Sequence, residues 1–233
     1  MIAGKIYNAR WSLERTLRDH RMRVDETIIQ NATDILKRRL KEATATDSLD
    51  TLRGIEGVAA VAYFGVFDQM ILREKESFSF QGRSRRPPLD RINALLSFAY
   101  SLLTSECASA LSAAGLDAYV GFMHQDRPGR TSLALDLMEE LRPVIADRFV
   151  LTAINNRIIT KQEFVITETG AVFLKEEGRK RFLSAWQEKK KETIIHPFLK
   201  EKMAWGLVPH IQAMLLARHL REDLDAYPPF LWK

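Results

Sequence analysis

Apolar residues recur at three- and four-residue intervals along most of this chain, and that period constrains its fold more than any other feature. One such face runs through residues 25–43, which we therefore predict to form an amphipathic helix. The same pattern predicts further helices over residues 49–76, 90–114, 131–148, 176–191 and 198–223. Because proline cannot donate a backbone hydrogen bond, we expect Pro143 to kink its helix close to Glu139, and Pro209 to kink the last one.

One segment has the signature of β-structure. Residues 163–167 and 171–174 flank Glu168-Thr169-Gly170, a sequence that favours a tight turn between two short strands. Glycine and proline residues within 78–88 and 116–129 interrupt the helical pattern and predict two loops. The predicted fold is therefore mainly α, with one short β-hairpin near 163–174.

Composition narrows the class of protein. The 233 residues allow one large domain or two small ones, and the single cysteine, Cys107, excludes an intrachain disulfide framework and a cysteine-rich zinc site. No apolar run approaches the ~20 residues that span a bilayer, and no signal peptide is evident, so we expect a soluble cytoplasmic protein without a membrane partner. The net charge of +5 favours an anionic partner without establishing one.

Acidic residues and one histidine form the first candidate site. Glu56 stands in an otherwise apolar stretch, where a buried carboxylate needs a partner. His124 lies in the second loop, and Asp136 and Glu139 share one face of the following helix. An imidazole with helical carboxylates suits a divalent metal. A solvated Glu56 and a hydrogen-bonded histidine beside a solvated acidic face remain the alternatives.

Basic residues in the two loops form a second candidate site. Guanidinium groups on exposed loops suit contacts with phosphate, although a solvated loop explains the same residues. The candidate phosphate contacts are Arg83, Arg85, Arg86, Arg127 and Arg130. No phosphate-cradling glycine loop, redox CxxC motif or convincing Ser-His-Asp arrangement is present in the sequence.

Several segments, in this order, resemble the CRISPR-associated integrase family that captures new spacers (CRISPR-associated protein number 1). The resemblance runs from about Lys5 to Lys191. The matching stretches are Ile55-Glu56-Gly57 to Tyr63-Phe64, Phe78-Ser79-Phe80, Arg85-Arg86-Pro87-Pro88, Asn93-Ala94-Leu95-Leu96-Ser97, Gly115-Leu116-Asp117, Gly121-Phe122-Met123-His124, Arg127-Pro128-Gly129-Arg130, residues 132–140 and Asp147-Arg148.

The resemblance implies catalytic roles for three residues. Glu56, His124 and Glu139 match the family's metal ligands, and Asp136 is a supporting acidic position. In some relatives the final acid is an aspartate, where this chain has Glu139. Two carboxylates and one imidazole suit Mn²⁺ or Mg²⁺. Such a metal supports attack of a prespacer 3′-hydroxyl on a phosphodiester at the CRISPR repeat, without a covalent protein–DNA intermediate.

The resemblance also implies partners and a domain order. The family acts on prespacer and repeat DNA, binds CRISPR-associated protein number 2 and forms homodimers. It has an N-terminal β-sandwich before its helical domain, but no run of alternating strands precedes the helices in this sequence. We therefore predict a linker helix region over residues 1–24 and a helical metal-dependent endonuclease/integrase domain over 25–233. An expressed fragment, a natural truncation and a misassigned start each explain that departure.

Two other functions remain open at this point. The chain could be a catalytically silent helical domain that binds DNA or a protein partner. It could also be a metal-dependent nuclease outside CRISPR adaptation.

Overall fold

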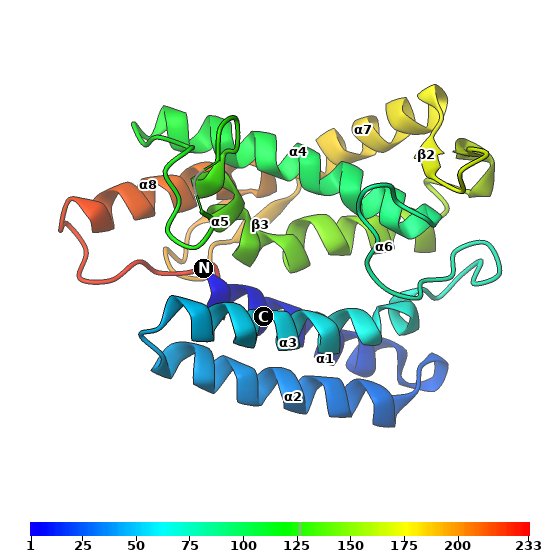
Figure 1. Ribbon diagram of the computed structural model, residues 1–233, viewed down its shortest axis with the longest axis horizontal. Coiled ribbons are helices and arrows are strands. Elements are labelled where there is room, and N and C mark those ends of the chain that lie inside the picture. Colours follow the sequence, from blue (N-terminus) through cyan, green and yellow to red (C-terminus); the bar gives the residue numbers. More distant parts are fainter. Residues whose placement is uncertain (126) are drawn as a thin grey trace.

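Two groups of helices make up the protein. The computed structural model describes residues 1–125 and 127–233. In Figure 1 the lower layer contains α1 (Ile2–His20), α2 (Glu26–Ala45) and α3 (Leu49–Gly65). The upper layer contains α4 (Arg91–Ala113), α5 (Ser132–Leu141), α6 (Arg148–Asn155), α7 (Glu176–Lys191) and α8 (Val208–Leu220). The prediction of a mainly α fold is confirmed.

Side-chain caps set where three of the helices begin. The side chain of Asp25 accepts a hydrogen bond from the backbone N–H of Ile28 at the start of α2. Ser48 caps α3 and Asp90 caps α4 in the same way. The prediction that the α3 helix continues to residue 76 is wrong, because α3 ends at Gly65 and a 3₁₀ turn, Phe67–Met70, follows. This turn buries apolar side chains as an α-helix would, so periodicity alone does not distinguish the 3₁₀ turn from a continuing helix.

The predicted proline kink is a change of helix type. A π-helical segment, Arg142–Asp147, joins α5 to α6, with Pro143 in its first turn. The distortion thus begins three residues after Glu139, and the helix continues beyond residue 148. Pro209 instead occupies the first turn of α8, where its missing N–H has no intrahelical role.

Two short hairpins complete the fold. β1 (Phe164–Ile166) pairs antiparallel with β2 (Val172–Leu174), which confirms the predicted hairpin. A second antiparallel pair, β3 (Thr193–Ile195) and β4 (Lys202–Ala204), was not predicted. It overturns the prediction that the last helix starts at residue 198. Its strands are only three residues long, too short for a period to show.

Helix α1 connects the two layers. It packs against α2 and α3 on one side and against α5 and the π-helical segment on the other. Buried Asn8 donates hydrogen bonds to the carbonyl oxygens of Glu140 and Phe230, both at 2.7 Å, and so links α5 to the C-terminal tail. The division into residues 1–24 and 25–233 stays a prediction, although α1 lies inside the same core as the later helices.

Helix α4 passes beneath the candidate loops. By length and composition it could cross a membrane, with a mean hydropathy of 1.3, contrary to the expectation that no segment would reach that length. Core helices pass the same test, and its buried side chains, including Cys107, pack against α5 and α8. The sequence of α4 is therefore explained by its place in the core.

Candidate metal centre and arginine-lined cavity

Two of the predicted acidic residues meet on one lysine. Glu56 projects from α3 and Glu139 from α5, and the ammonium group of Lys5, on α1, lies between them. Lys5 Nζ forms a short ion pair with Glu56 and lies 2.6 Å from Glu139 Oε2. The proposed alternative of a solvated Glu56 is wrong, because its carboxylate is paired and three-quarters buried.

Glu139 is a buried carboxylate that keeps its charge. Arg142, one turn later, approaches its other oxygen at 2.9 Å. Burial raises the pKa of Glu139, but the positive charges of Arg142 and Lys5 outweigh that effect and hold its pKa at about 2. Glu139 is therefore an ionised acceptor at neutral pH, a condition for binding a cation.

Asp136 orients His124. Its Oδ1 lies 2.5 Å from His124 Nδ1, and its other oxygen accepts backbone hydrogen bonds from Phe122 and Met123 at 2.6 and 2.9 Å. Because Asp136 engages Nδ1, the other ring nitrogen, Nε2, is left to face a ligand. The loop can approach α5 this closely because residue 121 is glycine: a Cβ there would lie 2.7 Å from Ser132 Cβ.

The structure brings the predicted residues together in two pairs. Glu56 and Glu139 share Lys5, whereas His124 is paired with Asp136. Glu139 and His124 are also coupled electrostatically. Within residues 1–125 and 127–233, no three His, Cys, Asp or Glu side chains form a ready-made metal-ligand group.

The donor set nevertheless fits a divalent cation. Glu56 and Glu139 already converge on a positive charge, the Lys5 ammonium. His124, held by Asp136, lies in the loop that leads into α5, the helix that carries Glu139. Two carboxylate oxygens and an imidazole nitrogen are ligands that Mn²⁺ accepts, and Mg²⁺ favours the oxygens. The predicted alternative of a solvated acidic face is wrong, because Asp136, Glu139 and Glu140 are buried.

Lys5 and Arg142 are site residues that sequence reasoning missed. Lys5 follows Ile2 and precedes Ile6 and Ala9, all buried, so its position in an apolar face was a signal that its charge has a partner. Arg142 also gave a signal, because it follows Glu139 by three residues, a spacing at which opposite charges on a helix can pair.

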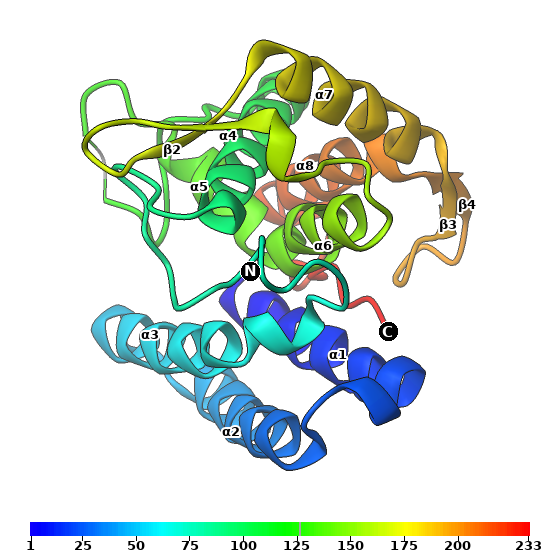
Figure 2. The same cartoon turned by 90° about the vertical axis from the view of Figure 1, so that its right-hand side faces the viewer.

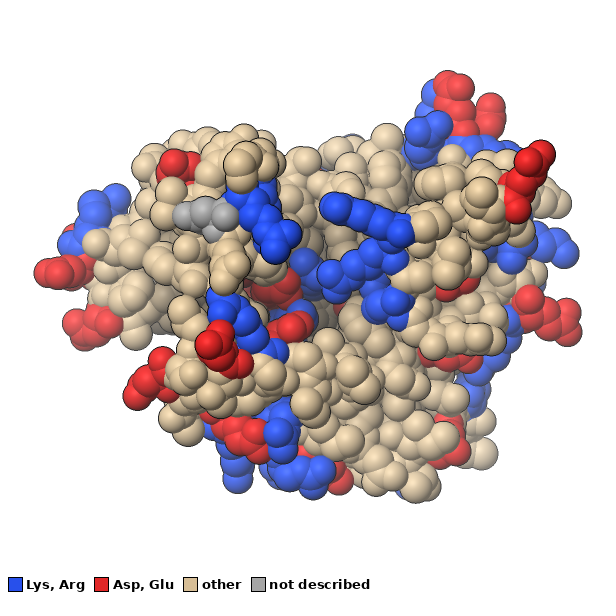
Figure 3. Space-filling view, in the orientation of Figure 1, with Lys and Arg blue, Asp and Glu red and all other residues tan. Residues whose placement is uncertain are grey.

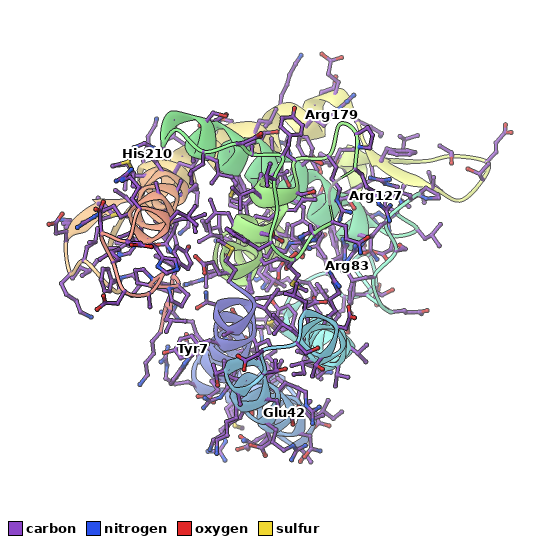
Figure 4. The ribbon with its side chains drawn as sticks, turned by 60° about the vertical axis from the view of Figure 1, so that its left-hand side comes forward. Tyr7, Glu42, Arg83, Arg127, Arg179 and His210 are labelled. Atoms are coloured by element: carbon purple, nitrogen blue, oxygen red, sulfur yellow. The ribbon has the colours of Figure 1, made fainter. Side chains whose placement is uncertain are left out.

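The arginines differ in their environments. Arg83 lies over the rings of Phe64 and Tyr100, and donates a hydrogen bond to Asn93 Oδ1 at 2.5 Å. Burial lowers its pKa, so Arg83 is part of the protein interior as much as of the surface. Arg85, Arg86 and Arg127 are exposed and Arg130 is half-buried. Figure 4 places Arg83 and Arg127 on the same side of the ribbon, from the loops before α4 and α5.

A cavity of about 530 Å³ reaches from Glu56 to Arg83 and Arg85. Its charged and tyrosyl lining comprises Lys5, Glu56, Tyr63, Arg83, Arg85, Tyr100, Arg142 and Asp147. In Figure 3, positively charged side chains gather around a hollow in the middle of this face, with acidic side chains within it. At the base, Tyr100 donates a hydrogen bond to buried Asp147 at 2.5 Å, and burial raises the pKa of Asp147 to about 6.

These features define a helical protein with a carboxylate–histidine centre beside an arginine-lined cavity. The family described as CRISPR associated protein Cas1 matches residues 1–188, and the chain belongs to that family. A CRISPR-associated endonuclease Cas1 of Chlorobaculum tepidum is 54% identical over the whole chain, which spans 68% of that protein. A Cas1 endonuclease of Leptospira interrogans is 45% identical, and the chain covers 91% of it.

Solved structures agree with this assignment. A casposase bound to integration product superposes with a TM-score of 0.77 at 26% identity, over 99% of this chain and 62% of that one. A chain of a partial Cas6-RT-Cas1–Cas2 complex gives a TM-score of 0.81 at 26% identity, over all of this chain and 66% of that one. The chain thus spans somewhat less than two thirds of these neighbours.

Proposed function

We propose that this chain is a metal-dependent DNA endonuclease/integrase unit of CRISPR adaptation, which joins prespacer 3′-hydroxyl ends to the repeat by phosphodiester transesterification. The observation that carries the proposal is the convergence of Glu56 and Glu139 on one positive charge, beside a histidine already oriented by Asp136. The Cas1 family match and the likeness to a casposase on its integration product support it.

Glu56, His124 and Glu139 would hold Mn²⁺ or Mg²⁺. When bound, such an ion supplies Lewis-acid chemistry at a phosphoryl oxygen and lowers the pKa of a coordinated hydroxyl. The chain's own residues prepare that place: Arg142 fixes one oxygen of Glu139, and Asp136 fixes the ring of His124. Lys5 must leave its position between the two carboxylates before both oxygens can turn to a metal.

Exposed arginines would position the DNA. Arg85 lines the cavity, and Arg86, Arg127 and Arg130 lie in the loops before α4 and α5. None of the four forms an ion pair with a described residue, so their guanidinium groups are available to phosphate. Arg83, held by Asn93, would act from the cavity wall. These contacts fix the register of a strand and carry no sequence information.

Partners are proposed from the neighbours. The Cas1–Cas2 complex in the comparison supports binding to CRISPR-associated protein number 2, and family membership supports a homodimer acting in the cytoplasm. Prespacer and repeat DNA would enter at the arginine-lined cavity.

Metal titration and strand transfer on branched DNA test the proposal together. We expect Mn²⁺-dependent cleavage or joining by the wild-type chain and at least a ~100-fold loss in Glu56→Gln and His124→Ala. The matched control is Glu168→Gln, an exposed acid in the β1–β2 turn. Calorimetry with Mn²⁺ on the same proteins separates lost metal binding from lost DNA binding.

Two other outcomes of these experiments would contradict the proposed function. If wild type and His124→Ala give equal heats with Mn²⁺, and both bind DNA in a salt-sensitive and metal-independent way, the chain is a catalytically silent binding domain. Equal rates on branched DNA with and without a repeat sequence would instead indicate a general nuclease.

A further inference from the structure

A second cavity lies at the other end of α1. It has a volume of about 420 Å³ and is formed by the last turns of α1, residues 70–73, α6 and the C-terminal tail. Figure 2 shows the C-terminal end of the chain beside α1 and below α6. Its basic lining comprises Arg15, Arg18, His20, Arg23, Arg73, Arg148 and Lys233. Among the described residues that line this cavity, Asp19 is the only carboxylate side chain.

Arg148 is a partly buried cation outside any ion pair. Its guanidinium lies over the ring of Trp232, 4.4 Å from the ring centre, and forms no ion pair with a residue in the described part of the chain. Burial and, to a smaller extent, the nearby charge of Arg15 lower the pKa of Arg148 to about 10, and they outweigh the opposing charges of Asp19 and Glu192. Both effects act against the charged form, so a neighbouring anion would be stabilising.

Arg15 faces the same ring. Its guanidinium lies 5.0 Å from the centre of Trp232, and its Nε is 3.7 Å from Asp19. That carboxylate also accepts a closer hydrogen bond from Arg18, at 2.9 Å. One exposed aspartate therefore serves Arg15 and Arg18, whereas Arg148 has no carboxylate of the described residues within ion-pair distance.

The platform under these two arginines is fixed. Trp232 packs edge-on against Trp205 at 5.2 Å, and its backbone N–H donates to the side chain of buried Asn8 at 2.9 Å. Two guanidinium groups are thus held near each other before any ligand arrives. Preorganised donors bind more tightly, because the ligand does not have to order them.

We propose that this cavity, which we call the Trp232 pocket, binds a phosphate group between Arg15 and Arg148. The planar guanidinium fork matches the oxygens of phosphate, and several surrounding cations suit a multiply charged anion better than a single carboxylate. The ligand chemistry is a phosphodiester of a nucleic-acid strand or the phosphates of a free nucleotide. The pocket does not share Lys5, Glu56 or Arg83 with the candidate metal centre and is independent of the function proposed above.

Calorimetry with two probes tests the Trp232 pocket. Inorganic pyrophosphate and a five-nucleotide single strand are titrated separately into wild type, Arg148→Met and Arg179→Met, all without divalent metal. Arg179 is the matched control, because it is exposed on α7 and Figure 4 shows it at the opposite side of the upper layer from α1. We expect Arg148→Met to lose at least tenfold in affinity, and Arg179→Met to stay within twofold of wild type.

The two probes distinguish the sources of the phosphate. A nucleic-acid site predicts that the oligonucleotide binds more tightly than pyrophosphate and that Arg148→Met reduces its salt dependence by about one charge. A free-nucleotide site predicts the reverse order, with ATP competing against pyrophosphate.

Loss of folding is controlled by a second substitution. Arg148→Lys keeps the charge and most of the packing on Trp232 but cannot form the fork, so it should bind pyrophosphate more weakly than wild type at an unchanged melting temperature. Arg15→Met should weaken binding as well. Wild-type affinity in Arg148→Lys and Arg15→Met, or equal losses in Arg148→Met and Arg179→Met, would overturn the proposal.

Discussion

The two ends of helix α1 differ in how the charged side chains around them are paired. Near its start, Lys5 neutralises two carboxylates that converge from α3 and α5. Near its end, Arg15 and Arg148 converge on Trp232, and Arg148 forms no ion pair with a described residue. The first end has paired charges as it stands and must release an internal cation to accept a metal. The second end has more cations than paired carboxylates and can accept an anion at Arg148 without breaking an ion pair.

The largest expected effect comes from removing Glu139, the shared ion-pair partner near the start of α1. Glu139→Ala removes the partner of both Lys5 and Arg142, and breaking a buried pair in this way destabilises by about 3–5 kcal/mol. Urea unfolding in EDTA measures that loss. Glu139→Gln, which keeps the shape, should retain more stability but still lose at least ~100-fold in Mn²⁺-dependent DNA cleavage. Unchanged cleavage in Glu139→Gln would contradict its role as a ligand.

Acid titration sharpens the same comparison, because two buried acids shift in opposite directions. The pKa of Glu139 is lowered to about 2, so its contribution is present above pH 4.5 and is lost as the pH falls towards 2, by about 3 kcal/mol. The pKa of Asp147 is raised to about 6, so stability falls as the pH rises from about 4 to 6. The free energy of unfolding, measured at a series of pH values from 2 to 8, gives both slopes.

Single substitutions assign these slopes. Glu139→Gln should reduce the loss of unfolding free energy below pH 4.5. Asp147→Asn should reduce its fall between pH 4 and 6. A wild-type profile in both variants would show that other groups set the pH dependence.

Asp136→Asn tests orientation without removing a ligand. The asparagine amide has one accepting oxygen where the carboxylate has two. The ring of His124 and the backbone of its loop therefore cannot both keep their contacts with residue 136. Partners of metal-bound histidines typically contribute about 10–100-fold to metal affinity. We expect a loss in that range for Mn²⁺ by calorimetry, with the helical circular dichroism of wild type. His124→Ala in the Asp136→Asn background should add little.

Lys5→Met tests whether the internal cation competes with metal. Without Lys5, the two carboxylates repel each other, and the chain should unfold about 1–3 kcal/mol more easily in EDTA. Mn²⁺ should bind several-fold more tightly, because no ammonium has to leave. Opposite signs in the two measurements are the expected signature, and a parallel loss in both would show that Lys5 serves packing alone.

The smallest effects fall on the exposed arginines. Arg85→Met and Arg86→Met each remove one exposed cation from the loop before α4, which lines the arginine-lined cavity through Arg85. We expect a two- to fivefold loss of DNA affinity and a salt dependence reduced by about one charge, measured by fluorescence anisotropy at several salt concentrations. Arg179→Met is again the control and should leave both quantities unchanged.

Much of the helical framework was predictable from sequence. The predicted helix starts at residues 49 and 90 agree within one residue with those of α3 and α4, and the turn at Gly170 marks the first hairpin. The extension of α3 beyond Gly65 and the second hairpin were mispredicted, because a 3₁₀ turn and three-residue strands leave no period of their own.

The candidate site was predictable only in part. Glu56, His124, Asp136 and Glu139 follow from residue type and resemblance, and the structure places them in two adjoining pairs. Arg142 follows Glu139 by three residues and could have been found from that spacing, whereas Lys5 was missed because no rule of spacing connects residue 5 to residue 56 or 139. That connection exists only where α1 crosses between the layers.

The sequence by itself determined which segments are helical and which residue types could carry chemistry, because those properties are local. The tertiary structure alone decided which charges face each other. It placed Lys5 between two carboxylates distant in the chain, and it brought Trp232, from the C-terminal tail, beneath arginines of α1 and α6. Coulomb energy depends on distance in space and on burial, and neither can be read from sequence separation.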